Sequence, residues 1–189
     1  MIRVQVFIIS IIIASAVSAK TTVGFSKGEK DTLIHEHSGI EFPKKIEKYR
    51  RKSVEAFEET GSNVGVQYQK NGVHLTFFVY PRDMGLKQTE AEFIDALDYA
   101  ESINPGTENH NATCTTISKK EKSLEMFYGA FSYPKEKELA GGLLMLAGGK
   151  NSFYKIRATM PWTVDHIKEG MLFIGDIMLE LIPEATLCK

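Results

Sequence analysis

The sequence is poor in cysteine, in excess charge of either sign and in long apolar runs. Two cysteines are too few for a small scaffold built on disulfides. The 23 Lys and Arg residues nearly balance the 24 Asp and Glu residues, which argues against a general nucleic-acid binder. Beyond residue 19, no stretch is apolar over the roughly 20 residues that a membrane-spanning helix needs. We therefore expect no nucleic-acid partner and no transmembrane anchor in the mature protein.

Local signatures of catalysis and of phosphate binding are also missing. There is no G-x-S-x-G elbow, and neither cysteine has the local signature of a nucleophile. The stretch GGKNS fails as a phosphate loop, because Leu144 stands where the first glycine belongs and Asn151 where a hydroxyl residue belongs. An enzyme whose site is assembled from scattered residues stays open as an alternative.

The stretch LIHEHSGIEFP, residues 33–43, raises the question of a metal site. On a strand, His35 and His37 share a face and could hold an ion from one side, whereas Glu36 points the opposite way. The remaining histidines, His74, His110 and His166, are isolated in the sequence. We interpret the stretch as the polar start of a strand and expect no metal and no cofactor, with a metal carrier as the alternative.

The first nineteen residues have the pattern of a signal peptide. Arg3 precedes an apolar core, and Val17 and Ala19 occupy the small positions before a cleavage point. Cleavage after Ala19 would leave about 170 residues, which suits one domain. Residues 20–37 are polar and lack a sustained period, so we expect a flexible mature N-terminus there. The single domain is then residues 38–189, with regular structure beginning at Ser38.

The two cysteines, Cys114 and Cys188, are the minimum for one disulfide in a secreted chain. A bond between them would close a loop of about 75 residues and stabilise the fold by roughly 4 to 5 kcal/mol in the chain-entropy model. Two free thiols are the alternative.

Two hairpins and two helices follow from the patterns. In NVGVQYQKNGVHLTFFVYP, Asn71-Gly72 suits a type I′ turn and pairs Tyr68 with Leu75 and Val66 with Phe77 on one apolar face. Residues 89–103 and 164–181 have the spacing of amphipathic helices, the second behind a Thr163 N-cap.

In the second hairpin, LAGGLLMLAGGKNSFYKIRATMP, a three-residue loop would pair Leu146 with Ile156 and Leu144 with Ala158. A two-residue loop would instead place leucines opposite Lys155 and Arg157, so we favour the three-residue loop. The elements together predict an α+β domain in which an antiparallel sheet of about five to seven strands packs against two amphipathic helices.

The stretch PKKIEKYRRK is the largest local departure from balanced charge. Its basic residues, against a lone Glu47, are Lys44, Lys45, Lys48, Arg50, Arg51 and Lys52. They could form an anion-binding patch, or they could be the solvated charges that guard an edge strand against pairing. If they are exposed charges, replacing Arg50 and Arg51 by Ala should weaken binding of an anion while leaving the melting temperature nearly unchanged.

The order of elements along the chain resembles that of small secreted domains of uncharacterised bacterial families. The elements that carry the resemblance are SGIEFP, a basic YRR strand, VGVQYQ, LTFFVYP, a helix and FYKIRATMPW before the last helix. They are more distantly similar to the PsbP/Mog1-type α/β sandwich. The resemblance covers most of the mature chain, lies in the order of elements and carries over no functional residue. It implies a binding or assembly module.

We therefore expect a soluble exported protein, periplasmic or secreted, that acts as a non-catalytic binding or assembly module of the bacterial envelope. A sheet face or the basic strand would receive the partner, which would be an envelope protein, a lipid or an anionic polymer. The alternative is the enzyme with a non-local active site.

Overall fold

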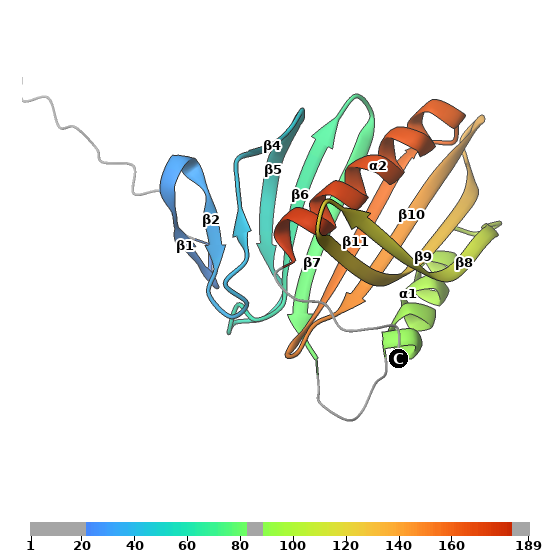
Figure 1. The fold of residues 1–189 in the computed structure, drawn as a ribbon. Helices are drawn as coiled ribbons and strands as arrows, with labels where there is room; N and C mark the ends of the chain where they lie inside the picture. Colours follow the sequence, from blue (N-terminus) through green and yellow to red (C-terminus); the bar gives the residue numbers. More distant parts are fainter. Residues whose placement is uncertain (1–21, 83–88, 183–189) are drawn as a thin grey trace, which may run out of the picture.

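The computed structural model describes residues 22–82 and 89–182, which form two antiparallel sheets and two helices (Figure 1). The larger sheet contains β4 (Lys45–Ile46), β5 (Tyr49–Ala56), β6 (Val64–Lys70), β7 (Val73–Pro81), β8 (Glu108–Lys119), β9 (Lys122–Lys135), β10 (Glu138–Gly148) and β11 (Ser152–Pro161). Its strand order is β4-β5-β6-β7-β11-β10-β9-β8. The α+β class, the antiparallel sheet and the two helices are confirmed. The prediction of five to seven strands was too low, since this sheet alone has eight.

The hairpin β6–β7 has the predicted register. Tyr68 lies opposite Leu75 and Val66 opposite Phe77, and all four side chains are buried on one face. Asn71 and Gly72 have φ angles of 46° and 80°, the positive values that a type I′ turn requires at both central positions.

The two helices cover opposite faces of the larger sheet. Helix α2 (Val164–Leu181) begins behind the predicted cap, because the Thr163 side chain accepts a hydrogen bond from the His166 N–H. It packs on the main core face, with Phe173, Ile174, Ile177 and Met178 buried. Helix α1 (Thr89–Ile103) lies against β9 and β10 on the other face, where Phe93 and Leu97 are buried. The sheet therefore has two apolar regions, one on each face.

The register of the β10–β11 hairpin differs from the prediction. Leu144 lies opposite Arg157 and Leu146 opposite Lys155, which is the pairing that the three-residue loop was meant to avoid. The prediction assumed one buried face. Because α1 covers β10 but not the whole of β11, leucines buried beneath the helix can lie beside charged residues at its margin.

A small second sheet precedes the larger one. It consists of β1 (Phe25–Lys27), β2 (Leu33–His35) and β3 (Glu41–Phe42), with Phe25, His35 and Phe42 buried. Regular structure therefore begins before Ser38, where the sequence predicts its start. Strands of two or three residues are too short to show a period of two, so only the burial of their side chains reveals them.

No helix in the two described ranges is long and apolar enough to cross a membrane. The predicted signal peptide and Cys188 lie outside the described residues, so cleavage after Ala19 and the Cys114–Cys188 bond stay predictions.

Candidate functional site

The six basic residues of the predicted patch do not form one surface. Successive residues of a strand point to opposite faces, so β5 and its flanking turn send these side chains in different directions. Lys48 lies in the β4–β5 turn beside helix α2, and Lys52 is exposed where the pairing of β5 with β6 shifts register. Each of the other four residues belongs to one of two groups with different roles.

Arg51 and Lys44 hold the small sheet against the larger one. The Arg51 guanidinium donates to the carbonyl oxygens of Phe42 and of Asp31, the latter at 2.7 Å. Lys44 forms an ion pair of 2.7 Å with the Asp31 carboxylate and holds the pKa of that carboxyl below its usual value. Arg51 is therefore not an exposed charge, and its replacement would disturb folding as well as any binding.

Lys45 and Arg50 begin a row of polar side chains that crosses five strands. Each member is the direct cross-strand partner of the next in the sheet, in the order Lys45, Arg50, Gln69, His74 and Thr159. The row lies on the face opposite α2, since the strand neighbours of these residues are buried in the α2 core. We call these five residues the polar row.

Side chains in the polar row are close enough to act together. Directly opposed residues in an antiparallel pair have Cβ atoms about 4.5 to 5.5 Å apart. The row contains amine, guanidinium, amide, imidazole and hydroxyl groups, all of which can donate hydrogen bonds, and it contains no carboxylate. Such a surface suits an anion or a string of anionic and carbonyl groups.

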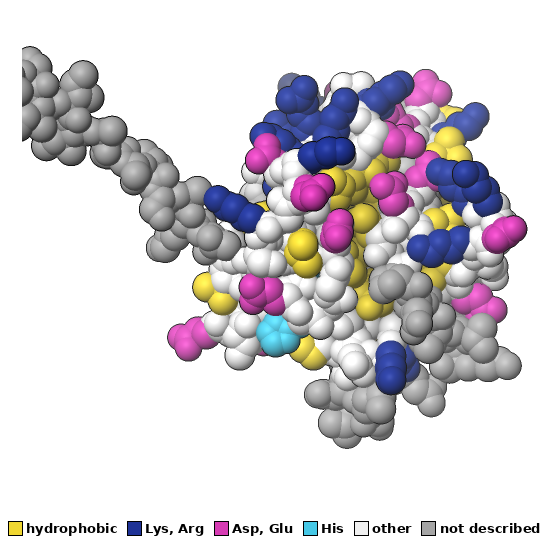
Figure 2. All heavy atoms as spheres, turned by 60° about the vertical axis from the view of Figure 1, so that its left-hand side comes forward, with side chains coloured by type: hydrophobic (Ala, Val, Ile, Leu, Met, Phe, Trp, Pro, Cys, Tyr) yellow, Lys and Arg dark blue, Asp and Glu magenta, His cyan; other side chains and the backbone are white. Residues whose placement is uncertain are grey.

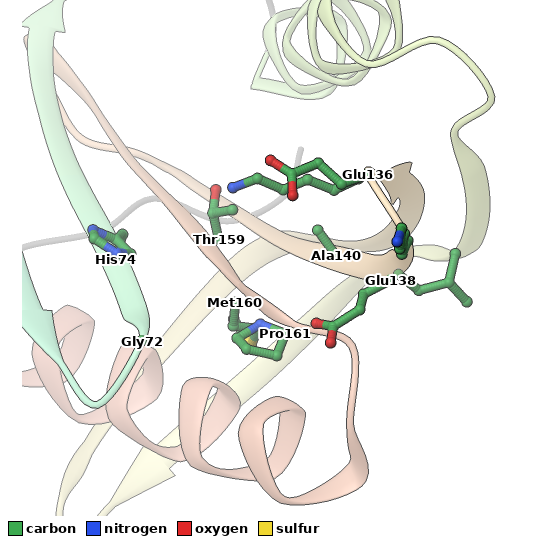
Figure 3. A pocket seen from close by; sticks show the side chains of 11 residues that line it. Gly72, His74, Glu136, Glu138, Ala140, Thr159, Met160 and Pro161 are labelled. Atoms are coloured by element: carbon green, nitrogen blue, oxygen red, sulfur yellow. The ribbon is translucent and has the colours of Figure 1, made fainter.

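A pocket of about 770 Å³ opens at the Thr159 end of the polar row. Its walls are the turn after β6, which ends at Gly72, and residues 135–140 of the β9–β10 hairpin, while Thr159 to Pro161 of β11 lie between them. In Figure 3, His74 and Glu136 stand on opposite sides of this pocket with Thr159 between them. The polar row therefore runs into a hollow that could hold one end of an extended ligand.

The surroundings of His74 bear on catalysis. Its Nε2 atom lies 3.3 Å from Gln69 Nε2, and within the described part of the chain it has no hydrogen bond to a carboxylate. An acid–base histidine is commonly oriented by such a carboxylate. His74 is instead placed to accept a hydrogen bond from the side-chain amide of Gln69, on a face where a ligand could contact it.

A second row beside the first continues the uncovered face toward α1. It pairs Ser53 with Gln67, Gln67 with Thr76, and Thr76 with Arg157. Arg157 and Phe78 then line a smaller hollow of about 210 Å³ against the α1 side chains Glu92, Asp95 and Tyr99.

The far end of this face is aromatic. Phe57 stacks on Phe78 with ring centroids 6.0 Å apart, and Lys155 Nζ lies 4.8 Å from the ring centroid of Tyr80. Burial and a 2.7 Å hydrogen bond to Glu92 raise the pKa of Tyr80, so it stays a neutral donor. The face opposite α2 thus changes along its strands from cationic and polar, where it is uncovered, to aromatic, where it meets α1.

The basic end is visible from the side of the molecule. Figure 2 shows Lys and Arg side chains gathered along the upper rim, the end at which Figure 1 has the β4–β5 and β6–β7 turns. Acidic side chains stand below this rim and separate it from the lower part of the same view.

The two histidines of the stretch LIHEHSGIEFP have structural partners. The buried ring of His35 lies 2.8 Å from Ser38 Oγ through Nδ1 and 2.9 Å from the Gly61 carbonyl oxygen through Nε2. His37 Nε2 lies 3.2 Å from the Thr60 carbonyl oxygen. In the described ranges, no three His, Cys, Asp or Glu side chains are grouped so that they could hold a metal ion. His35 fastens the small sheet to the loop after β5.

The buried position of His35 predicts a pH dependence of stability. Burial lowers its pKa below the ordinary value of 6.5, so the folded state resists protonation more than the unfolded chain does. Stability from this residue is therefore complete above the unfolded pKa and is lost as pH falls below about 6.5. Between pH 7.5 and pH 5, His35→Gln should lose less melting temperature than the parent.

His37→Gln is the matched control for this experiment, because His37 is exposed and bonded through one nitrogen only. It should keep most of the parent's pH dependence, because burial is the largest cause of the lowered His35 pKa and the charge of His37 a smaller one. Parallel melting curves for the parent and His35→Gln across this pH range would contradict the assignment.

Sequence reasoning missed most of the polar row. The alternation that predicts one apolar face of the β6–β7 hairpin leaves Gln69 and His74 paired on the other face. Sequence reasoning rejected the register that brings Arg157 beside Leu144, although that mixture of charge and apolar residues marks the border of the uncovered face. Thr159 has no sequence signal of its own.

Comparison of the sequence with protein-family models and with curated proteins found no match. The site is therefore interpreted from its own geometry.

Proposed function

We propose that this chain is an exported, non-catalytic binding module of the bacterial envelope that takes an anionic partner on the polar row. The partner is an envelope protein, a lipid or an anionic polymer that presents acidic or carbonyl groups in an extended arrangement. The resemblance to PsbP/Mog1-type sandwiches, which mostly serve as binding or assembly modules, supports the same class.

The observation that carries the proposal is the row itself. Five donor side chains from five neighbouring strands stand in line on a face that α1 leaves uncovered, and the line ends in a pocket. Rigid strands fix the spacing of these groups, so a ligand that matches it would lose little free energy in ordering the protein.

The binding function predicts a difference between two single substitutions in the same basic stretch. Arg50→Ala removes a charge from the polar row, and we expect about a tenfold loss of affinity because a hydrogen bond to a charged group is worth roughly 1.5 to 3 kcal/mol. Lys48→Ala removes an equal charge from the turn beside α2 and should leave affinity within about twofold. Titration with polyphosphate and with phosphatidylglycerol vesicles, alongside pull-downs from envelope extract, measures both.

Affinity for the charged probes should also fall as salt rises, because exposed charges act over about 8 Å at physiological ionic strength. Arg51 is left intact, since its contacts with Phe42 and Asp31 would mix a folding defect into the result. Equal weakening by Arg50→Ala and Lys48→Ala would show a diffuse charge effect and reject the polar row as the site.

A further inference from the structure

An exposed pair of aromatic side chains lies beside the two rows of polar residues, on the same face of the larger sheet. Phe57 directly follows β5, and its side chain is 47% exposed although phenylalanine is among the residues most often buried. Its ring stacks on the half-buried ring of Phe78 in β7, with centroids 6.0 Å apart and 29° between the ring planes. We call Phe57 and Phe78 the aromatic platform.

Gly65 of β6 allows the Phe57 ring to lie close to the sheet. Gly65 is the direct cross-strand partner of Phe78 on one side and of Glu55 on the other. A Cβ atom at Gly65 would stand 3.1 Å from Cε2 and 3.2 Å from Cζ of Phe57, so the ring occupies the space that a larger side chain would fill. The Phe57 N–H also donates to the Asn63 carbonyl oxygen at 2.9 Å. The platform is thus positioned before a ligand binds, which lowers the cost of binding.

The groups next to the platform can both donate and accept hydrogen bonds. Gln67 stands two residues from Gly65 along β6, Thr76 stands two residues from Phe78 along β7, and the two are direct cross-strand partners. Among the residues that the structure describes, no hydrogen bond occupies either of these side chains. An amide has two donors and an acceptor oxygen, and a hydroxyl group both donates and accepts. The hydroxyl groups of a sugar have the same double character, so they match this pair.

The polar row lies one further step along the same strands. From Phe78 to His74 the distance along β7 is about 13 Å at the rise of an extended strand. Over this distance the face changes from aromatic, through the uncharged Gln67 and Thr76, to the donors of the polar row. A ligand that contacts all three regions must combine apolar surface, hydroxyl groups and negative charge along an extended chain.

We propose that the aromatic platform, Gln67 and Thr76 form subsites for sugar rings, and that the anionic partner of the polar row is a polysaccharide in which uronic acids alternate with neutral sugars. The carboxylate of a uronic acid binds to the polar row, so this inference rests on the proposed function. A pyranose ring carries C–H bonds on its faces and hydroxyl groups around its edge. The C–H face of the neutral sugar packs on the platform, because an aromatic ring offers an apolar face with partial negative charge.

Glu55 is the reason for placing a neutral sugar on the platform. Its exposed carboxylate stands beside Gly65, where it can accept hydrogen bonds from sugar hydroxyl groups but would repel a second carboxylate. An acidic peptide or a polymer that is charged at every unit therefore fits this end of the face poorly. The acyl chains of a lipid need a continuous apolar surface, whereas Gln67 and Thr76 interrupt this one within two residues of the platform.

The test is a titration of the protein with hyaluronate oligosaccharides, in which glucuronate alternates with the neutral N-acetylglucosamine. Phe57→Leu keeps an apolar side chain but removes the ring, and it should lower the affinity about tenfold because the sugar loses its aromatic contact. Phe57→Tyr keeps the ring and should bind within about twofold of the parent. Leu172→Ala is the control, since Leu172 is an exposed apolar residue of α2 on the opposite side of the sheet, and it should not change the affinity.

Polyphosphate separates the sugar subsites from the polar row, because it is anionic but has no sugar rings. Phe57→Leu should leave its affinity within about twofold, since the stacking contact is absent from this ligand. Arg50→Ala should weaken the binding of both polymers. A protein that binds polyphosphate through Arg50 but does not bind hyaluronate would overturn the sugar subsites and leave the polar row standing. If Arg50→Ala weakens the binding of neither polymer, the polar row fails and the sugar subsites fail with it.

Saturation-transfer NMR on the parent protein gives a second readout that does not depend on any variant folding. Irradiation of the aromatic protons should transfer magnetisation to the C–H protons of N-acetylglucosamine more strongly than to those of glucuronate, because the neutral sugar packs on the rings. Transfer to glucuronate alone would overturn the proposal, as would hyaluronate binding by Phe57→Leu that equals the parent's. Tighter binding of phosphatidylglycerol vesicles than of hyaluronate, unchanged in Phe57→Leu, would indicate a lipid partner and would also overturn it.

Discussion

Replacing Phe77 by Ala is expected to lower the free energy of unfolding by about 3 to 5 kcal/mol. Phe77 is fully buried in the middle of the sheet and packs edge-on against Phe42, with ring centroids 5.4 Å apart. Its removal would leave a cavity where the small sheet, the large sheet and the α2 core meet. Urea denaturation followed by circular dichroism measures the loss.

Phe78→Ala is the matched control because the neighbouring residue carries the same ring to the opposite face. Phe78 is half-buried among Phe57 and Lys155 on the uncovered side of the sheet. We expect this substitution to lower the free energy of unfolding by only about 1 kcal/mol, since surrounding solvent can occupy the space. Similar losses for the two variants would contradict the assignment of one structural and one uncovered face.

Replacing Gly142 by Val is expected to destabilise the protein by about 3 kcal/mol through overpacking. A Cβ atom at this position would stand 2.1 Å from Cζ of Phe131, the residue directly opposite on β9. Phe131 is 1% exposed and belongs to the apolar cluster beneath α1. A shift of the ring would also disturb the packing of α1 on β9 and β10, so the melting temperature should fall markedly.

Gly175→Ala also adds a side chain at a glycine, but it is expected to raise the stability of the protein instead of lowering it. At this helical position the added Cβ would meet nothing closer than Ile117 Cδ1 at 4.0 Å. Alanine is favoured over glycine within a helix by about 1 kcal/mol, so this variant should be more stable than the parent. A Gly142→Val protein that melts at or above the Gly175→Ala protein would show that the Phe131 contact is misassigned.

The parts of the fold that sequence predicted well are those where two independent local signals agree. In the β6–β7 hairpin, Asn71-Gly72 fixes the turn and the apolar alternation fixes the same register. Helix α2 has its cap at Thr163 as expected, but its first residue, the apolar Val164, is 80% exposed. Apolar periodicity predicts the position of a helix more reliably than it predicts which side chains of the first turn are buried. The orientation of the first turn depends on how the preceding strand leads into the helix.

The remaining differences have one physical origin, which is that burial depends on what covers each face. The β10–β11 register could not be chosen from a pattern that assumes one apolar face, because α1 makes the second face apolar only over part of its width. The same partial cover creates the polar row, whose members are scattered from Lys45 to Thr159. Neighbours in sequence, such as Arg50 and Arg51, were grouped as one patch although a strand sends them to opposite sides.

The strand order has a consequence for a chain that emerges from its N-terminus onward. The neighbour of β7 on its inner side is β11, and the pairing begins with Pro81 opposite Ser152. Until β11 has been synthesised, the backbone N–H and C=O groups on one edge of β7 have no partner strand. The apolar residues Leu75, Phe77 and Val79 are also not yet covered by α2. The partly synthesised chain is therefore more prone to aggregation than the complete protein. We expect its survival to depend on a holding factor or on delayed release, a requirement that the completed sheet no longer has.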